Sequence, residues 1–298
     1  MAPSFAILHL IIMSAEFLTG ITANGFLIIM NCNELIKCRK LIPMQILLTC
    51  IGMARFGLQV VLMVQTSLSL FCPVFYKEKV YGAMLVACWT FFSSLSFWFA
   101  ACLSVFYCLK ISGFPWSCFF WLKFRISQVI LWLLLGSLLA SASIAVLSAE
   151  VFFSTSSKDD VLRNTTAGKT QLKVRKISEI LLVNLALLLP LGIFVLCIYM
   201  LFMSLSKHVQ RLSHGFRSVS TEAHVNALRM VITFFCFFIT YFAAFMTNLT
   251  FLIPYGSQWF FVMKDIMAAY PSGHSVIIIC SNSKLQQPFR RILCLRRK

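Results

Sequence analysis

The sequence contains few charged residues, and acidic residues are the scarcest of them. Charged side chains make up 12% of the 298 residues, whereas 60% are hydrophobic. A soluble domain averages about 25% charged and about 45–50% apolar residues. An excess of this size cannot be buried in one globular core. The composition therefore excludes a soluble protein and indicates a chain that folds in a lipid bilayer.

Patterns that carry catalysis or metal binding are missing as well. The five histidines are scattered, and none is paired with a further ligand at a spacing typical of metal sites. The sequence has no glycine-rich phosphate loop and no serine nucleophile elbow. We therefore expect no enzymatic activity, no metal and no cofactor. The paired broken helices and repeats of many transporters are not visible either, although a small-solute transporter stays open as a distant alternative.

Seven apolar stretches are long enough to cross a bilayer, which takes about 20 residues per helix. They predict an all-α membrane protein, with a single domain over residues 1–298 that forms a bundle of seven transmembrane helices. The expected helices run over residues 5–30, 44–69, 80–109, 127–149, 178–204, 230–253 and 259–280. Residues 285–298 mix apolar and basic side chains, which is typical of a short amphipathic helix on the inner membrane surface.

The segments between these stretches alternate between two patterns of charge. One set carries sixteen Lys and Arg against two acidic residues, and the other carries eight against five. The positive-inside rule places the first set in the cytoplasm, so the N-terminus is extracellular and the C-terminus cytoplasmic. The net charge of +17 then faces anionic lipid rather than nucleic acid, which we do not expect as a partner. Asn164 begins a glycosylation sequon in an outer loop, whereas the sequon at Asn248 lies inside a span, where we expect no modification.

Ionisable residues inside the expected spans are costly and mark function or contacts between helices. Four of them matter here, namely Glu16, Arg55, Lys264 and Asp265. From their depth, we expect Arg55 and Asn24 to form a buried polar clasp between the first, second and seventh helices. Two interpretations of Lys264 stay open. Its amine either points into a cavity, toward a ligand with hydrogen-bond acceptors, or reaches the outer lipid headgroups.

Six sequence blocks, spread in order over nearly the whole chain, resemble one receptor family. The blocks are Phe97–Ile111, Phe120–Arg125, Ser204–His208, Thr221–His224 with Ala227-Leu228, Tyr270–Ser275 and Asn282–Leu285. They closely resemble the signatures of the bitter taste receptors (taste receptor type 2), which are G-protein-coupled receptors. The resemblance implies a plasma-membrane receptor that detects small bitter agonists and signals through gustducin-type heterotrimeric G proteins. The vomeronasal pheromone receptors of the first type are the nearest alternative.

The resemblance also implies which residues bind the agonist and which contact the G protein. The implied agonist site consists of Trp89, Ser93, Phe97, Tyr241, Phe245 and Lys264. The spacing of four residues puts Trp89, Ser93 and Phe97 on one helical face, although Trp89 also fits an interfacial aromatic anchor. Some relatives carry an acid where this chain has Lys264, which favours neutral or anionic ligands over cationic ones. The implied coupling residues are Lys110, Lys123, Arg125, His208 and His224, for which binding to anionic lipid is the alternative role.

Overall fold

The computed structural model describes residues 3–38, 42–111, 117–158, 166–213, 219–249, 257–281 and 283–294. Ten helices cover nearly all of these residues, and the described ranges contain no strand. The helices are α1 (Pro3–Cys38), α2 (Pro43–Phe71), α3 (Pro73–Lys77), α4 (Lys79–Ile111), α5 (Ser117–Phe124), α6 (Ile126–Lys158), α7 (Thr166–Ser213), α8 (Val219–Leu249), α9 (Gln258–Ser281) and α10 (Ser283–Cys294). The predicted fold class, an all-α membrane protein, is confirmed.

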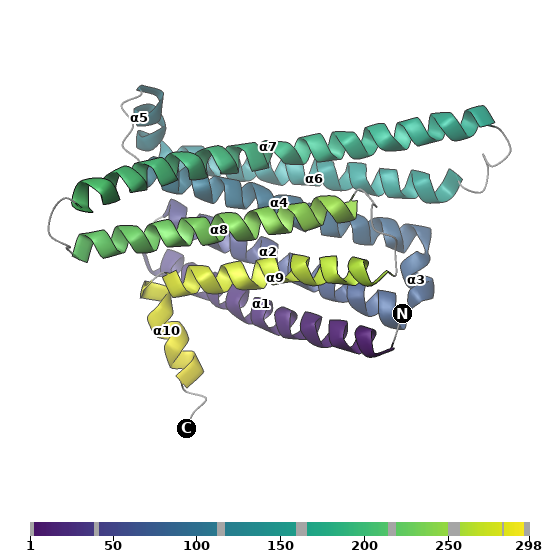
Figure 1. The fold of residues 1–298 in the computed structure, drawn as a ribbon, viewed down its shortest axis with the longest axis horizontal. Helices are drawn as coiled ribbons and strands as arrows, with labels where there is room; N and C mark the ends of the chain where they lie inside the picture. The colour runs from purple at the N-terminus through teal and green to yellow at the C-terminus, as the bar shows by residue number, and fades with distance from the viewer. Residues whose placement is uncertain are drawn as a thin grey trace.

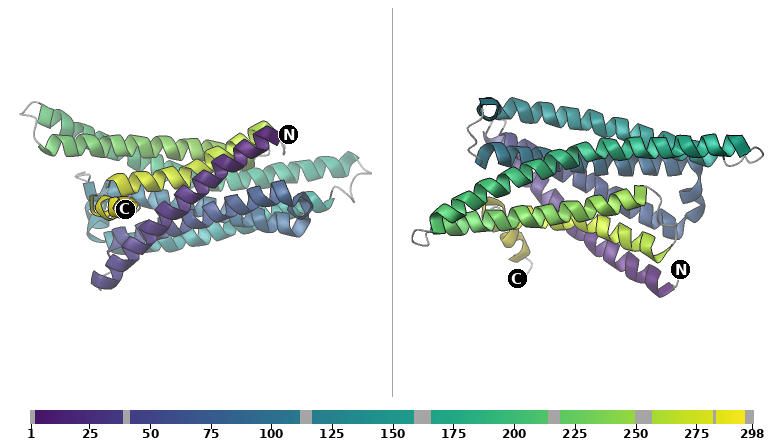
Figure 2. Two further views of the ribbon diagram at one scale, coloured as in Figure 1. Left: turned by 90° about the horizontal axis from the view of Figure 1, so that it is seen from below. Right: turned by 45° about the horizontal axis from the view of Figure 1, so that its top comes forward.

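Seven of these helices are long and lie side by side as a bundle (Figure 1). The short helix α3 lies at the end of the bundle that also holds the N-terminus, whereas α5 and α10 lie at the opposite end (Figures 1 and 2). The first, second, third, fourth, fifth, sixth and seventh long helices are α1, α2, α4, α6, α7, α8 and α9. The orientation of this bundle in the membrane remains the prediction drawn from the charges.

Five helical segments of the described chain are long and apolar enough to cross a membrane, judged by length and composition. They are Phe5–Lys37, Pro43–Phe71, Lys79–Ile111, Ile126–Phe153 and Leu181–Ser204. In α8 the described apolar segment, Ile232–Asn248, is shorter. The helix α9 does not belong to this set because its composition is more polar; it contains Lys264 and Asp265.

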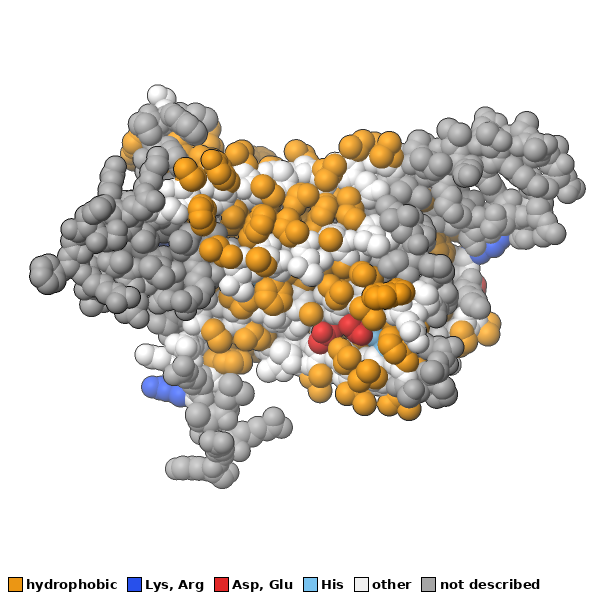
Figure 3. Space-filling view, in the orientation of Figure 1, with side chains coloured by type: hydrophobic (Ala, Val, Ile, Leu, Met, Phe, Trp, Pro, Cys, Tyr) orange, Lys and Arg blue, Asp and Glu red, His pale blue; other side chains and the backbone are white. Residues whose placement is uncertain are grey.

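The outer surface of the bundle is apolar, as a bilayer requires. Large hydrophobic side chains on α6 and α7 are exposed, among them Trp132 at 74%, Leu139 at 70% and Tyr199 at 60%. Figure 3 shows hydrophobic side chains spread over the middle of one face of the molecule. A soluble monomer rarely exposes so much contiguous apolar surface, so lipid is the natural solvent of this face.

The helix α4 lies at the centre of the bundle and packs against α2, α6 and α7. One hydrophobic core joins it to α8 and α9 as well, and the side chain of Phe97 on α4 has no exposed surface. Residues on α4 therefore face several helices at once, which makes this helix a natural wall for a site between helices.

The helices differ from the predicted spans at their ends. The helix α7 runs for 48 residues, whereas the predicted span covered 178–204. Two short helices, α3 and α5, fall where the sequence predicted only connecting segments. The final predicted residues of the sixth span, 250–253, lie outside the described residues, as do the sequon at Asn164 and the end of the chain after Cys294.

Candidate ligand-binding site

Five of the six predicted agonist-binding side chains form one buried cluster between α4 and α8. Each of them is at most 7% exposed. The ring of Phe97 lies 4.9 Å from that of Tyr241 and 5.4 Å from that of Phe245, measured between centroids. The rings of Trp89 and Phe245 are 4.8 Å apart. Ser93 joins the cluster through its hydroxyl, to which Tyr241 Oη donates a hydrogen bond of 3.0 Å.

Helical spacing explains why α4 contributes these three residues together. Trp89, Ser93 and Phe97 follow one another at intervals of four, so they lie in a row along one face of α4. On α8, Tyr241 and Phe245 are also four residues apart and lie opposite that row. We call these five residues the aromatic cluster.

Lys264 is the sixth predicted site residue, and it has different neighbours. Its side chain is 3% exposed, so it is turned into the protein rather than onto its surface. The amine lies 5.0 Å from the ring centroid of Phe260 and 5.7 Å from that of Tyr76. Aromatic faces attract a cation, but within the described part of the chain the amine has no hydrogen-bond acceptor. The indole nitrogen of Trp89 is likewise without an acceptor there.

A layer of polar contacts on α9 adjoins the aromatic cluster. The guanidinium of Arg55, on α2, is fully buried. One of its nitrogens bonds to Nδ1 of His274, and the other donates a hydrogen bond of 3.3 Å to Tyr270 Oη. Because the arginine can only donate, His274 must accept at Nδ1. Sequence reasoning missed both partners of Arg55, although Tyr270 and His274 lie four residues apart and hence on one face of α9.

Asn24, on α1, binds the same part of α9 through different atoms. Its amide nitrogen donates to the carbonyl of Pro271 at 3.1 Å and to that of Gly20 at 2.8 Å. Its amide oxygen accepts a hydrogen bond of 2.6 Å from Ser275. The two predicted clasp residues, Asn24 and Arg55, thus each bind α9, one from α1 and the other from α2.

A stacked pair of tyrosines connects the aromatic cluster to this polar layer. The rings of Tyr241 and Tyr270 are nearly parallel, at an angle of 5°, and their centroids are 4.4 Å apart. Tyr241 also binds Ser93, and Tyr270 also binds Arg55. The stack of Tyr241 on Tyr270 thus brings the aromatic cluster into direct contact with a partner of Arg55.

The predicted coupling residues lie at the end of the bundle that carries α5. Lys110, Lys123 and Arg125 are exposed. The amine of Lys110 lies 5.6 Å from the ring of Phe106, and the guanidinium of Arg125 lies 5.2 Å from that of Trp121. His208 and His224 belong to α7 and α8, but their side chains lie outside the described ones.

Comparison with known proteins gives one consistent result. The sequence model of the family described as Taste receptor protein (TAS2R) matches residues 1–297. The chain is 68% identical over 302 residues to the human protein Taste receptor type 2 member 2, and the match covers all of both chains. It is 32% identical over 290 residues to human Taste receptor type 2 member 9, covering 96% of this chain and 93% of that one. It is 33% identical over 285 residues to Taste receptor type 2 member 7 of Macaca mulatta, covering 93% and 90%.

Proposed function

The chain belongs to the taste receptor type 2 family (TAS2R), and on that premise we propose where its agonists bind and how they signal. As a member of this family it is a bitter taste receptor in a membrane, with ligand binding and G-protein coupling as its general activities, rather than a pheromone receptor or a transporter. The proposal is that small bitter agonists bind beside the aromatic cluster and that gustducin-type G proteins respond at the plasma membrane.

The observation that carries the proposed agonist site is the aromatic cluster itself. It joins α4 to α8 almost without exposed surface, and its rings contact one another rather than lipid. Apolar aromatic walls with a few polar groups are typical of small-molecule sites. An agonist that binds beside the cluster and displaces Tyr241 from Phe97 replaces their contact with contacts of its own, and it thereby favours a different packing of α4 against α8.

Such an agonist signals only if it binds the new packing more tightly than the old one. The stack of Tyr241 on Tyr270 supports a route for this change, because Tyr270 also binds Arg55. Moving Tyr241 therefore disturbs the contacts by which α2 is attached to α9. We propose that this disturbance changes the packing of the helices toward the end that carries α5.

Two unpaired donors support a preference in ligand chemistry. The amine of Lys264 and the indole nitrogen of Trp89 are buried without an acceptor among the described residues. Unpaired buried donors are costly, so a ligand that offers an acceptor gains what the protein lacks. We propose neutral or anionic agonists with carbonyl, carboxylate or similar acceptor groups.

On the opposite end, exposed basic residues support the site of G-protein contact. Lys110, Lys123 and Arg125 lie on α4 and at α5, beside the buried contact of Phe119 with Cys108 and Leu109. This contact fastens α5 to the inner end of α4, so a shift of α4 moves these cations. We propose that they contact the G protein, together with His208 and His224.

The test is calcium release in cells that express the chain with a promiscuous gustducin-chimera G protein, screened against a panel of bitter compounds. Lys264→Ala and Trp89→Ala are compared with Trp132→Ala, a control that removes an exposed aromatic side chain from the lipid-facing surface of α6. We expect both site variants to reshape the response to acceptor-bearing compounds while the control retains it. A response that neither site variant alters, at normal surface expression, would refute the proposed site. Responses confined to cationic compounds would refute the preference for acceptors.

A further inference from the structure

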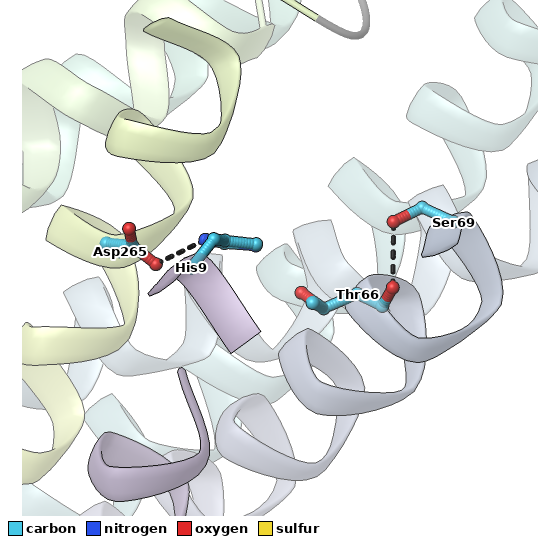
Figure 4. Close-up of polar contacts among 4 residues, drawn as sticks. All are labelled: His9, Thr66, Ser69 and Asp265. Atoms are coloured by element: carbon cyan, nitrogen blue, oxygen red, sulfur yellow. Dashed lines mark hydrogen bonds and ion pairs between the residues drawn. The ribbon is translucent and has the colours of Figure 1, made fainter. Parts of the chain in front are cut away.

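A histidine near the N-terminus contacts the neighbouring helix α9. His9, on α1, is 1% exposed. Its Nδ1 lies 2.6 Å from Oδ1 of Asp265, and the two form an ion pair when the imidazole is protonated (Figure 4). The same ring packs edge-to-face against Phe261, with centroids 4.8 Å apart. Figure 4 also shows Ser69 donating to the carbonyl of Thr66, a local bond at the end of α2 that is separate from this contact.

The two contacts of His9 named above fall on one face of α9. Phe261 and Asp265 are four residues apart, so they share that face. Phe260 and Lys264 are also four apart, and each lies about 100° round the helix from its neighbour in sequence. The amine of Lys264 accordingly lies over the ring of Phe260 and near Tyr76. Holding one face of α9 against α1 therefore sets the direction in which Lys264 points.

Simple packing does not account for the choice of residues at this contact. A buried imidazole and a carboxylate inside a span are expensive, and an apolar pair would join the two helices at less cost. Glu16 increases this free-energy cost, since it interacts electrostatically with Asp265 and its Oε2 has no hydrogen-bond partner among the described residues. Figure 3 shows acidic side chains gathered beside a histidine on an otherwise hydrophobic part of the surface.

An ion pair between two helices has one property that an apolar contact lacks. Two hydrophobic helices can rotate against each other with little change in buried area. The imidazole nitrogen and the carboxylate oxygen, 2.6 Å apart, attract each other strongly only at short range, so a rotation of α9 that separates them weakens the ion pair. Lys264 has no acceptor of its own among the described residues, so its own contacts fix its direction less tightly.

We propose that His9 is a positioning residue of the agonist site. By holding Phe261 and Asp265 it fixes the rotation of the outer half of α9 and keeps Lys264 directed into the protein. The role of Lys264 toward agonists rests on the function proposed above. The rotation of α9 does not, and it is measured without any agonist.

The first experiment measures the direction of position 264 directly. In the variant Lys264→Cys, we record on intact cells the rate at which a membrane-impermeant methanethiosulfonate reagent modifies the introduced thiol. The receptor that retains Lys264 is treated in the same way, and its rate gives the background from the native Cys72 and Cys88. We expect His9→Ala to raise this rate about tenfold, the factor that corresponds to losing one charge-assisted contact. His9→Asn keeps a donor near the position of Nδ1 and should restore a slow rate. Leu8→Ala, next to His9 but exposed, is the matched control and should have no effect.

Two further variants distinguish loss of the contact from loss of folding. One is His9→Phe, and the other exchanges the residues at positions 9 and 265. His9→Phe keeps a ring against Phe261 but removes the nitrogen, and we expect the same fast modification as in His9→Ala. Placing Asp at position 9 and His at position 265 together restores the contact, so this exchange should slow the modification again. An unchanged rate in both His9→Ala and His9→Phe, at normal surface expression, would overturn the proposal, as would failure of both His9→Asn and the exchange to restore the slow rate.

The agonist response then separates this inference from the proposed site. If Lys264→Ala and Trp89→Ala both leave every response unchanged while the modification rate still depends on His9, the agonist site is wrong and the positioning of α9 stands. If Lys264→Ala weakens responses while His9→Ala changes neither the rate nor the concentration dependence, the site stands and the role of His9 is refuted.

Discussion

At the scale of single residues, Arg55 is the largest fully buried side chain among the described residues. It is fully buried and binds both His274 and Tyr270 of α9. Replacing it with Met fills a similar volume but binds neither partner, and each buried polar group left unpaired costs about 1–3 kcal/mol. We expect Arg55→Met to lower the melting temperature of the purified receptor and its surface expression.

The matched substitution for this prediction is Arg55→Lys. It retains the charge, but a single ammonium replaces a planar fork that binds two groups at once. We expect it to be less stable than the wild type and more stable than Arg55→Met. A methionine variant that melts at the wild-type temperature would show that these contacts contribute no net stability.

A second prediction at this scale concerns the hydroxyl of Tyr241. Tyr241→Phe keeps the stack on Tyr270 and the contact with Phe97, and it removes only the hydrogen bond to Ser93. This bond joins α8 to α4 in the described packing, and its loss costs about 0.5–1.5 kcal/mol. We expect higher basal G-protein signalling per receptor at the surface. Ser93→Ala should act in the same direction, and the double variant should add little, because both remove one bond; additive effects would contradict this account.

At the scale of elements, α2 and α4 approach each other closely at a glycine. A Cβ at position 57 would lie 2.3 Å from Cε1 of Phe92 on α4. Although alanine is favoured over glycine inside a helix by about 0.5–1 kcal/mol, overpacking costs about 1–3 kcal/mol. We therefore expect Gly57→Ala to lower the melting temperature. Gly136→Ala on α6, where a Cβ meets nothing within 4 Å, should leave it unchanged or raise it; equal behaviour of the two variants would refute the close approach.

The elements also show what hydrophobic runs predict and what they miss. Apolar stretches of spanning length identify helices because a backbone inside lipid must satisfy its own hydrogen bonds. They do not mark where a helix ends, since the same bonding continues into water with polar side chains. This is why α7 extends to Ser213, well past the last residue of the predicted span. The helix α3 does have a local sequence signal, because Pro73 stands at its first position, where proline is favoured.

At the scale of the whole molecule, the site divides into a part that local spacing predicts and a part that it does not. The row formed by Trp89, Ser93 and Phe97 follows from helical periodicity on α4 alone. The partners across helices do not, because they join residues far apart in the chain. Arg55 and Tyr270 are 215 positions apart, and the contact of His9 with Asp265 spans almost the entire chain. Only the packing of the complete bundle determines such pairs.

The orientation of the molecule gives the last prediction, because it rests on charge rather than on contacts. The end of the bundle that holds α3 and the N-terminus is the expected outer end, and the end that holds α5 and α10 is the expected inner one (Figure 1). If so, Asn164 enters the lumen during synthesis and is glycosylated, whereas Asn248 lies within α8, too close to the membrane. We expect Asn164→Gln to abolish the electrophoretic shift that glycosidase treatment produces, and Asn248→Gln to leave it intact.

An N-terminal epitope tag should bind antibody on intact cells and a C-terminal tag only after permeabilisation. The reverse pattern of antibody binding would show that the bundle is inserted the other way round. The aromatic cluster would then no longer be assigned to the side from which agonists arrive.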